Sequence, residues 1–233
     1  MESTTQSRGL SIPTAAVIAI VVLVGTSFFI WLHHRTHGIY DVTQVGLAFF
    51  LVINVLICWW EMSLVFCRDQ IRAEYEANKD AYRGREMARV MEVFARPIPL
   101  FQVLSFRQWA TIWASYSLFD PGYSDARSFG YNIDVGNGFL TIVPTILFAF
   151  GMTFELMPAS VLGIIGIIIF WQMFYGTAVY FFQFFHNGRH RGHSLRNLVL
   201  FVGITNFMWL IFPLWGVWTS AQMIVDGSYS VFF

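Results

Sequence analysis

The amino-acid sequence predicts an all-α membrane protein with five transmembrane helices and a long cytoplasmic or interfacial connection between the second and third helices. Three observations support this fold class. Hydrophobic residues make up 56% of the chain and charged residues only 12%, which is typical of multi-pass membrane proteins. Five apolar stretches are each long enough to cross a bilayer, which takes about 20 helical residues. The basic residues are concentrated in segments that this topology places on one side of the membrane.

The first predicted helix covers residues 10–33 and follows a polar N-terminal tail, residues 1–9. Its apolar run is too long for the core of a signal peptide, and no small-residue cleavage site follows it. Trp31 and the segment His33-His34-Arg35-Thr36-His37 suit a membrane interface at its end. We therefore expect a spanning helix and not a cleaved leader.

A four-helix membrane domain is predicted over residues 44–225, with a short C-terminal tail at 226–233. Within the connection, residues 72–96 predict a surface helix closed by Pro97 and Pro99, and the aromatic stretch 100–119 is expected to lie in the interface. Pro144 is expected to kink the third helix. The elements of this domain are helix two at 44–67, the connection at 68–131, helix three at 135–156, helix four at 159–185 and helix five at 197–225.

The charge distribution predicts a multi-pass protein with its N-terminus in the cytoplasm or an equivalent inner compartment. With five spans, the N-terminus, the connection and the 186–196 loop share one side, which then holds thirteen of the fourteen lysines and arginines. The other side holds Arg35 alone. Basic residues favour the inner side of a membrane, so the imbalance supports both the helix count and the orientation.

Polar residues inside the predicted helices suggest a ligand cavity within the membrane. An amide or carboxyl in hydrocarbon is costly without a partner, so such residues face the bundle interior or a cavity. Asn206 and Trp209 are three residues apart and share a helix face. At about 1.5 Å per residue, several of these side chains lie at similar depth in the inner half of the membrane. The candidate ligand-binding residues are Glu61, Thr141, Gln172, Tyr175, Asn206 and Trp209.

A carboxyl, hydroxyls, amides and an indole suit an apolar ligand with one polar or cationic end, because carboxylates and indole faces both stabilise cations. The alternative for each residue is a hydrogen bond that only packs two helices together. For Glu61, which forms a polar stripe with Asn54 and Arg68 at seven-residue spacing, the alternative is an ion pair with Arg68 or a carboxylate reaching toward water.

We expect no metal, no cofactor and no nucleic-acid partner. His186, His190 and His193 have the spacing of a histidine box, but His33, His34 and His37 fall on the opposite side of the membrane in this topology, so the two clusters cannot share a site. Interfacial or solvated histidines are the simpler interpretation. A formal net charge of zero gives no electrostatic reason for nucleic-acid binding.

Several motifs in chain order resemble the emopamil-binding protein family, also called EXPERA-domain proteins. This family includes sterol isomerases, sigma-type receptors and lipid-handling relatives. The resemblance covers about residues 44–225 and includes Glu61 at the position of a glutamate in the second helix of the family. The motif residues are Trp113, Tyr116, Asp120 and Tyr123 in the connection, Gln172, Tyr175, Gly176 and Tyr180 in the fourth helix, and Asn206, Trp209 and Pro213 in the last helix.

The resemblance implies a frame that stabilises a cation and an acid–base set that is incomplete. Where the family has a histidine four residues before the glutamate, this chain has Ile57. The third-helix glutamate of the family falls at Gly138, or at Asn137 if the register shifts by one. The isomerases add a proton at one ring carbon, which gives a carbocation, and then remove a proton from another ring carbon. This chemistry normally needs two acid–base groups.

Three functions are therefore open. The first is a cavity that binds a sterol-like, lipid-like or amine-bearing ligand. The second is an accessory or structural subunit of a larger membrane complex, with other membrane proteins as partners. The third is an active sterol double-bond isomerase in which Glu61 is catalytic.

Overall fold

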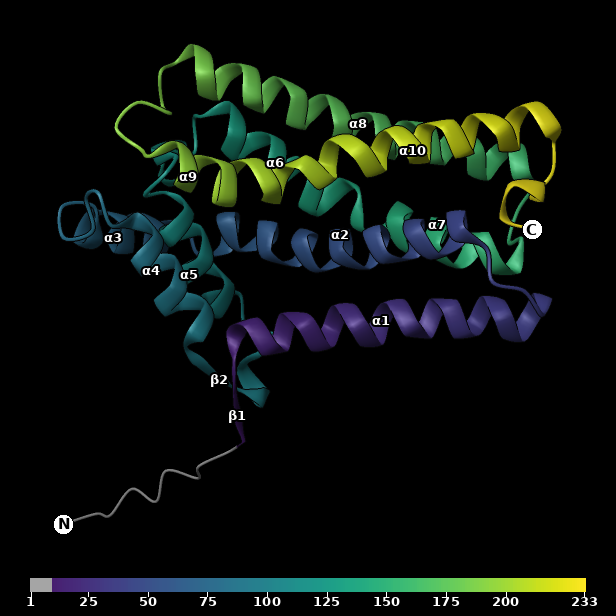
Figure 1. Cartoon of the computed structure of the whole chain (residues 1–233), viewed down its shortest axis with the longest axis horizontal. Helices are drawn as coiled ribbons and strands as arrows, with labels where there is room; N and C mark the ends of the chain where they lie inside the picture. The colour runs from purple at the N-terminus through teal and green to yellow at the C-terminus, as the bar shows by residue number, and fades with distance from the viewer. Residues whose placement is uncertain (1–9) are drawn as a thin grey trace.

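The computed structural model describes residues 10–233, and the predicted polar tail at 1–9 lies outside them. Long helices run side by side along the longest axis of the molecule, with short helices gathered at one end (Figure 1). The long helices are α1 (Thr14–His37), α2 (Val42–Phe66), α8 (Ala159–His186) and α10 (Ile204–Asp226).

The described chain contains four helical spans long and apolar enough to cross a membrane: α1, α2, α8, and a continuous stretch from Leu195 to Asp226 that ends in α10. A fifth span arises if α6 (Phe129–Leu140) and α7 (Ile142–Phe154), which are bent by 50° relative to each other, are counted together. Residues 10–233 are thus all-α apart from one short two-stranded sheet, and their apolar helices fit an integral membrane protein.

The bend between α6 and α7 lies at Thr141, three residues before Pro144. Proline has no N–H to donate to the carbonyl four residues earlier, and its ring clashes with that carbonyl. That residue is Leu140, where α6 ends. The predicted kink is therefore present, and it divides the predicted third helix in two.

The helix boundaries at the N-terminus differ from those predicted. Residues Ser11–Pro13 form strand β1, which pairs antiparallel with β2 (Pro97–Pro99), so the first helix begins at Thr14 and not at residue 10. The Thr14 hydroxyl and amide both bond to the carbonyl of Arg96 and fix this start to the connection. The helix continues to His37 and ends at Gly38, whose φ of 75° closes it in the left-handed conformation.

The connection contains more structure than the sequence indicated. The single surface helix expected at residues 72–96 is wrong, because two helices form there and Gly84, with a φ of +74°, lies in the turn between them. Within the aromatic stretch 100–119, every side chain from Trp109 to Tyr116 of α5 is buried by the rest of the protein, and the expected interfacial position of the stretch stays a prediction. The elements are α3 (Arg68–Asn78), α4 (Glu86–Ala95), the 3-10 turn η1 (Leu100–Gln102), α5 (Phe106–Tyr116) and the 3-10 turn η2 (Pro121–Ser124).

Helices α8 and α10 pack closely because glycines lie between them. A Cβ on Gly166 would meet Ser220, and a Cβ on Gly163 would come within 2.7 Å of the carbonyl of Ser220. Small residues allow helix backbones to approach one another where no hydrophobic effect drives association. Helix α10 packs in turn against α2, and α8 packs against α6 and α7.

The predicted fifth helix is not regular along its length. It starts as the single turn α9 (Leu195–Asn197), continues as a π-helical segment η3 (Leu198–Gly203) and becomes α-helical only at Ile204. A π-helical turn rotates the following residues relative to a regular helix and is common at functional sites. Phe201 lies in this segment, and Asn206 follows it within one turn.

The two ends of the bundle differ in charge. The twelve lysines and arginines from Arg68 to Arg196 belong to elements at the end that carries α3 and α9, while Arg35 lies near the opposite end (Figure 1). At the opposite end the C-terminal turn η4 (Ser230–Phe232) is fixed to α1, with His33 Nε2 3.2 Å from the carbonyl of Phe232. The structure contains no bilayer, so the N-terminus-inside orientation stays a prediction.

Candidate ligand-binding cavity

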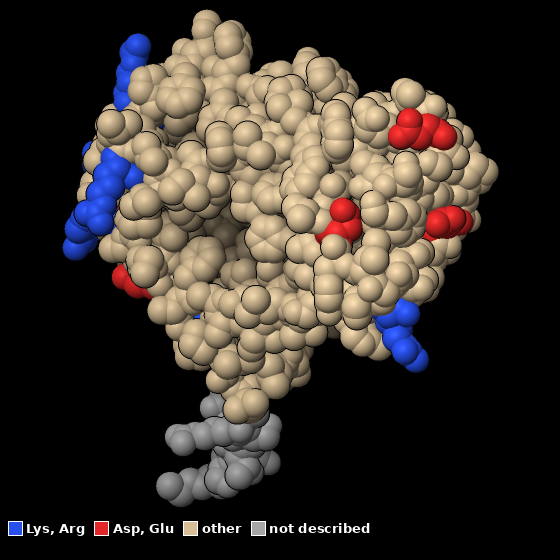
Figure 2. Space-filling view, turned by 45° about the vertical axis from the view of Figure 1, so that its right-hand side comes forward, with Lys and Arg blue, Asp and Glu red and all other residues tan. Residues whose placement is uncertain are grey.

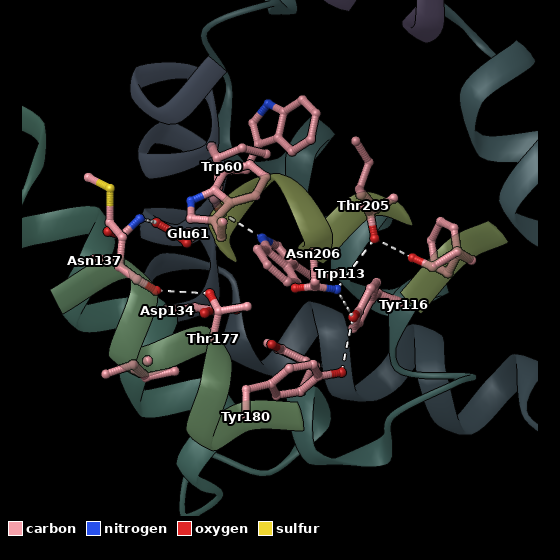
Figure 3. Close-up of a pocket in the computed structure, with 18 of the residues that line it drawn as sticks. Trp60, Glu61, Trp113, Tyr116, Asp134, Asn137, Thr177, Tyr180, Thr205 and Asn206 are labelled. Carbon is pink, nitrogen blue, oxygen red and sulfur yellow. Dashed lines mark hydrogen bonds between the residues drawn. The ribbon is translucent and has the colours of Figure 1, made fainter. Parts of the chain in front are cut away.

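A cavity lies where α2, α5, α6, α8 and α10 meet, toward the basic end of the bundle (Figure 3). Its empty volume is about 900 Å³, counting the open space at its mouth. Thr205 lines the cavity and is exposed, so the cavity reaches the surface beside the start of α10. Its apolar and aromatic lining includes Ile57, Trp60, Phe94, Ile112, Trp113, Tyr123, Ile133, Met173, Phe201 and Trp209.

Two carboxyl groups face this cavity, Glu61 from α2 and Asp134 from α6. Glu61 is 4% exposed and accepts a hydrogen bond of 2.8 Å from Nδ2 of Asn137. Asp134 contacts the cavity and the hydroxyl of Tyr123. No lysine, arginine or histidine among residues 10–233 lines the cavity, and neither carboxyl forms an ion pair in this part of the chain. The cavity is thus rich in acceptors that have no cationic partner.

A network of amides and hydroxyls holds Glu61 in place from behind. Asn137 donates to Glu61 and accepts a 2.9 Å bond from the Thr141 hydroxyl. Asn54, which is fully buried on α2, donates to Thr145 at 3.1 Å and accepts from the indole N–H of Trp209 at 3.2 Å. The network therefore fixes the Glu61 carboxyl and the Trp209 ring relative to each other across three helices.

Aromatic rings form the walls. The Trp113 indole donates a 2.8 Å bond to the carbonyl of Trp60 and stacks on Tyr123 with ring centres 5.0 Å apart. Trp60 in turn stacks on Trp109 at 5.0 Å. Indole faces attract cations, so these walls and the carboxyls favour the same kind of ligand group.

A second polar cluster lies apart from the carboxyls. Figure 3 shows Glu61 and Asp134 on one side of the cavity, with Asn206 and Tyr116 away from them. Nδ2 of Asn206 donates to the Tyr116 hydroxyl at 3.0 Å, and this hydroxyl lies 3.0 Å from that of Tyr180. Burial raises the pKa of Tyr116, which keeps its hydroxyl protonated and able to donate.

Most of the residues singled out in the sequence face this cavity. Glu61, Gln172, Asn206 and Trp209 converge on it from three helices. The motif residues Trp113, Tyr116, Tyr123 and Tyr180 line it as well. Binding of a ligand by these side chains stays a prediction.

The expected position of Tyr175 is wrong. Its side chain is 53% exposed and points away from the cavity, while Gln172, Met173, Gly176 and Tyr180 face it. With about 100° of rotation per residue, Tyr175 lies about 115° around α8 from the centre of that face. A helix that is apolar on all sides carries little sequence signal for which side faces the bundle.

Three further residues that the sequence analysis named are buried in the fold and do not line the cavity. Thr141 is buried behind the lining, where it bonds to Asn137. Asp120 is fully buried, caps η2 and pairs with Arg189 at 2.5 Å. Burial raises the pKa of Asp120, although the Arg189 guanidinium acts in the opposite direction. Pro213 is buried within α10.

Asp134 is the functional candidate that the sequence reasoning missed. It lies just before the predicted third helix, where an acidic residue suggests a membrane interface. Because α6 begins at Phe129, Asp134 is already inside a helix, three residues before Asn137 and on the same face. The three- and four-residue spacing of Asp134, Asn137 and Thr141 in the sequence, which places them on one helix face, was the signal that could have identified Asp134.

Metal ligands do not gather in the described part of the chain: residues 10–233 contain no group of three or more His, Cys, Asp or Glu side chains able to hold an ion. His33 instead lies 3.3 Å from the Thr153 hydroxyl, and His193 lies 3.8 Å from Glu86. Comparisons with models of protein families, with curated proteins and with solved structures give no match to the chain. The resemblance to emopamil-binding proteins therefore stays a prediction from the motifs.

Proposed function

We propose that this integral membrane protein binds an apolar, sterol-like or lipid-like molecule that carries a cationic or protonated amine group. The observation that supports the proposal is the pair of carboxyls, Glu61 and Asp134, in an aromatic cavity whose described lining has no basic side chain. A carboxylate in such a place is costly unless it meets a positive charge or a hydrogen-bond donor. A protonated amine supplies both, and the apolar body of the ligand fills the rest of the cavity.

The position of the site agrees with a ligand that comes from the lipid. Figure 2 shows a broad face of the molecule with few charged side chains and a hollow on that face. Thr205 and Phe94, neither of which is charged, belong to the cavity lining and are exposed or partly exposed. An uncharged entrance suits a membrane-dissolved ligand better than a polar solute.

The test is the binding of a cationic amphiphile with a rigid apolar body to the purified protein in lipid nanodiscs. Because charge-assisted hydrogen bonds contribute about 1.5–3 kcal/mol, we expect Glu61→Gln and Asp134→Asn each to weaken binding by about 10- to 100-fold. Glu155→Gln, which removes a carboxyl at the opposite end of the bundle, is the matched control and should bind as the unmodified protein does. Equal affinity in all four proteins would refute the proposal.

A second candidate function is the isomerisation of a sterol-like double bond. It is favoured by the two carboxyls on different helices, which supply the second acid–base group that the sequence seemed to lack. In this scheme one protonated carboxyl donates its proton to an alkene carbon and leaves a carbocation beside the indoles. The other carboxylate then removes a proton from a neighbouring carbon, so the double bond moves and the net proton count is unchanged.

Incubation of sterol substrates in D₂O, followed by NMR of the ring carbons, tests this scheme. We expect deuterium at the protonated carbon and a shifted double bond, with both signals lost in Glu61→Gln and in Asp134→Asn. Turnover that survives in either variant, or no turnover of any sterol, would exclude this mechanism. The role as an accessory subunit stays a prediction, which isolation of a complex with stoichiometric partners would test.

A further inference from the structure

The amide of Asn206 is held in one orientation, with its oxygen left available. Nδ2 donates to the backbone carbonyl of Val202 at 2.8 Å and to the hydroxyl of Tyr116 at 3.0 Å, which uses both of its protons. A backbone carbonyl can only accept a hydrogen bond, so the NH₂ group of the Asn206 amide must face Val202. The amide therefore cannot be flipped to exchange its nitrogen and oxygen. Oδ1 of Asn206 has no hydrogen-bond partner within residues 10–233, although Asn206 lines the cavity.

The partners of Asn206 are part of a cluster of hydroxyls. The Tyr116 hydroxyl accepts from Asn206 and lies 3.0 Å from the Tyr180 hydroxyl, where either oxygen can be the donor. Both protons of the Asn206 amide are used within this cluster, so the group that Asn206 leaves for a ligand is an acceptor, Oδ1.

This acceptor is neutral and lies apart from the two carboxyls. Glu61 and Asp134 come from α2 and α6, whereas the Asn206 cluster comes from α10, α5 and α8. The two ends of the cavity therefore prefer different donors: a cation at the carboxyls and an uncharged donor at the amide.

We propose that Asn206 forms a second subsite that recognises a hydroxyl group on the end of the ligand opposite its amine. This inference deepens the proposed function, because it concerns the same cavity, but it makes a separate claim about the ligand. The ligand class is then a rigid apolar body with two polar ends, one a protonated amine and the other a hydroxyl. A hydroxyl fits because it donates to Oδ1 without requiring a counter-charge.

The experiment uses four ligands that share one sterol-derived ring body: with and without the amine, and with and without the hydroxyl at the other end. Binding to the full-length protein in nanodiscs is measured for each ligand. A neutral hydrogen bond contributes about 0.5–1.5 kcal/mol, so the hydroxyl should tighten binding by about 3- to 10-fold in the unmodified protein. Asn206→Leu should abolish this preference, so that ligands with and without the hydroxyl bind the variant with equal affinity.

Two further variants separate recognition from folding. Tyr116→Phe removes the hydroxyl that holds the Asn206 amide and should reduce the hydroxyl preference, and it is the alternative test if Asn206→Leu does not fold. Tyr175→Phe, on the outward face of α8, is the matched control and should keep the preference. Equal affinity of the unmodified protein for ligands with and without the hydroxyl would overturn the inference, as would equal weakening of all ligands by Asn206→Leu.

The four ligands also distinguish failure of the Asn206 subsite from failure of the proposed amine-binding function. Loss of the amine preference with retention of the hydroxyl preference would refute the cation proposal alone. Retention of the amine preference without any effect of the hydroxyl would refute the Asn206 subsite alone. If none of the four ligands binds, both proposals are wrong.

Discussion

Replacement of Gly138 by alanine tests how closely α6 must approach α2 to build the cavity. A Cβ on Gly138 would lie 2.9 Å from Cβ of Glu61 and 3.0 Å from the carbonyl of Cys58, where ordinary contacts begin at 3.4 Å. The helices must therefore separate by about 0.5 Å, the difference between 3.4 and 2.9 Å. Overpacking of this kind costs about 1–3 kcal/mol.

The same displacement acts on the site itself. If α6 moves away from α2 by this amount, the bond between Asn137 Nδ2 and Glu61, now 2.8 Å, lengthens to about 3.3 Å, beyond the usual range. We expect Gly138→Ala to lower the melting temperature by about 2–12 °C, taking about 2–4 °C per kcal/mol for a chain of this size. The affinity for a cationic amphiphile should fall as well.

Gly136 provides the matched control, because it lies on the same helix and a Cβ there would meet no atom within 4 Å. Gly136→Ala should leave binding unchanged and raise the melting temperature slightly, since alanine favours helix more than glycine by about 1 kcal/mol. Melting of both variants in detergent, followed by circular dichroism, provides the comparison. Equal melting temperatures and affinities for Gly138→Ala and Gly136→Ala would show that the close approach of the two helices does not control the site.

Two other predictions concern buried polar groups. Asn54→Ala removes the acceptor of the Trp209 indole, so it should destabilise the fold by about 1–3 kcal/mol and weaken ligand binding. The control Asn187→Ala, at the exposed end of α8, should change neither stability nor binding. Arg189→Ala leaves the Asp120 carboxylate buried without its partner and should cost about 3–5 kcal/mol, most of which Asp120→Asn should restore in the double variant. Burial raises the pKa of Asp120 in the fold above its unfolded value, so folding favours the protonated form and the stability of Arg189→Ala should rise as the pH falls. Melting temperatures at about pH 5 and about pH 8 check this sign, and a lower melting temperature at the acidic pH would contradict it.

The sequence by itself determined the long helices of this protein. An apolar stretch of about 20 residues satisfies its backbone hydrogen bonds internally, so its existence depends on local composition and not on its neighbours. The same local rules set the break before Pro144 and the shared face of Asn206 and Trp209. These features follow from spacing along one helix and need no knowledge of the others.

Only the tertiary structure decided which faces of these helices meet. The sequence analysis placed Tyr175 in the cavity because an evenly apolar helix does not reveal which of its sides faces lipid. It missed Asp134 because the start of a helix shifts by several residues with its tertiary contacts. The burial of α5 depends on its packing against α2, α3 and α4, which lie elsewhere in the chain. The rotation of each helix is fixed by close contacts such as Gly138 against Glu61, and these contacts exist only after the helices have assembled.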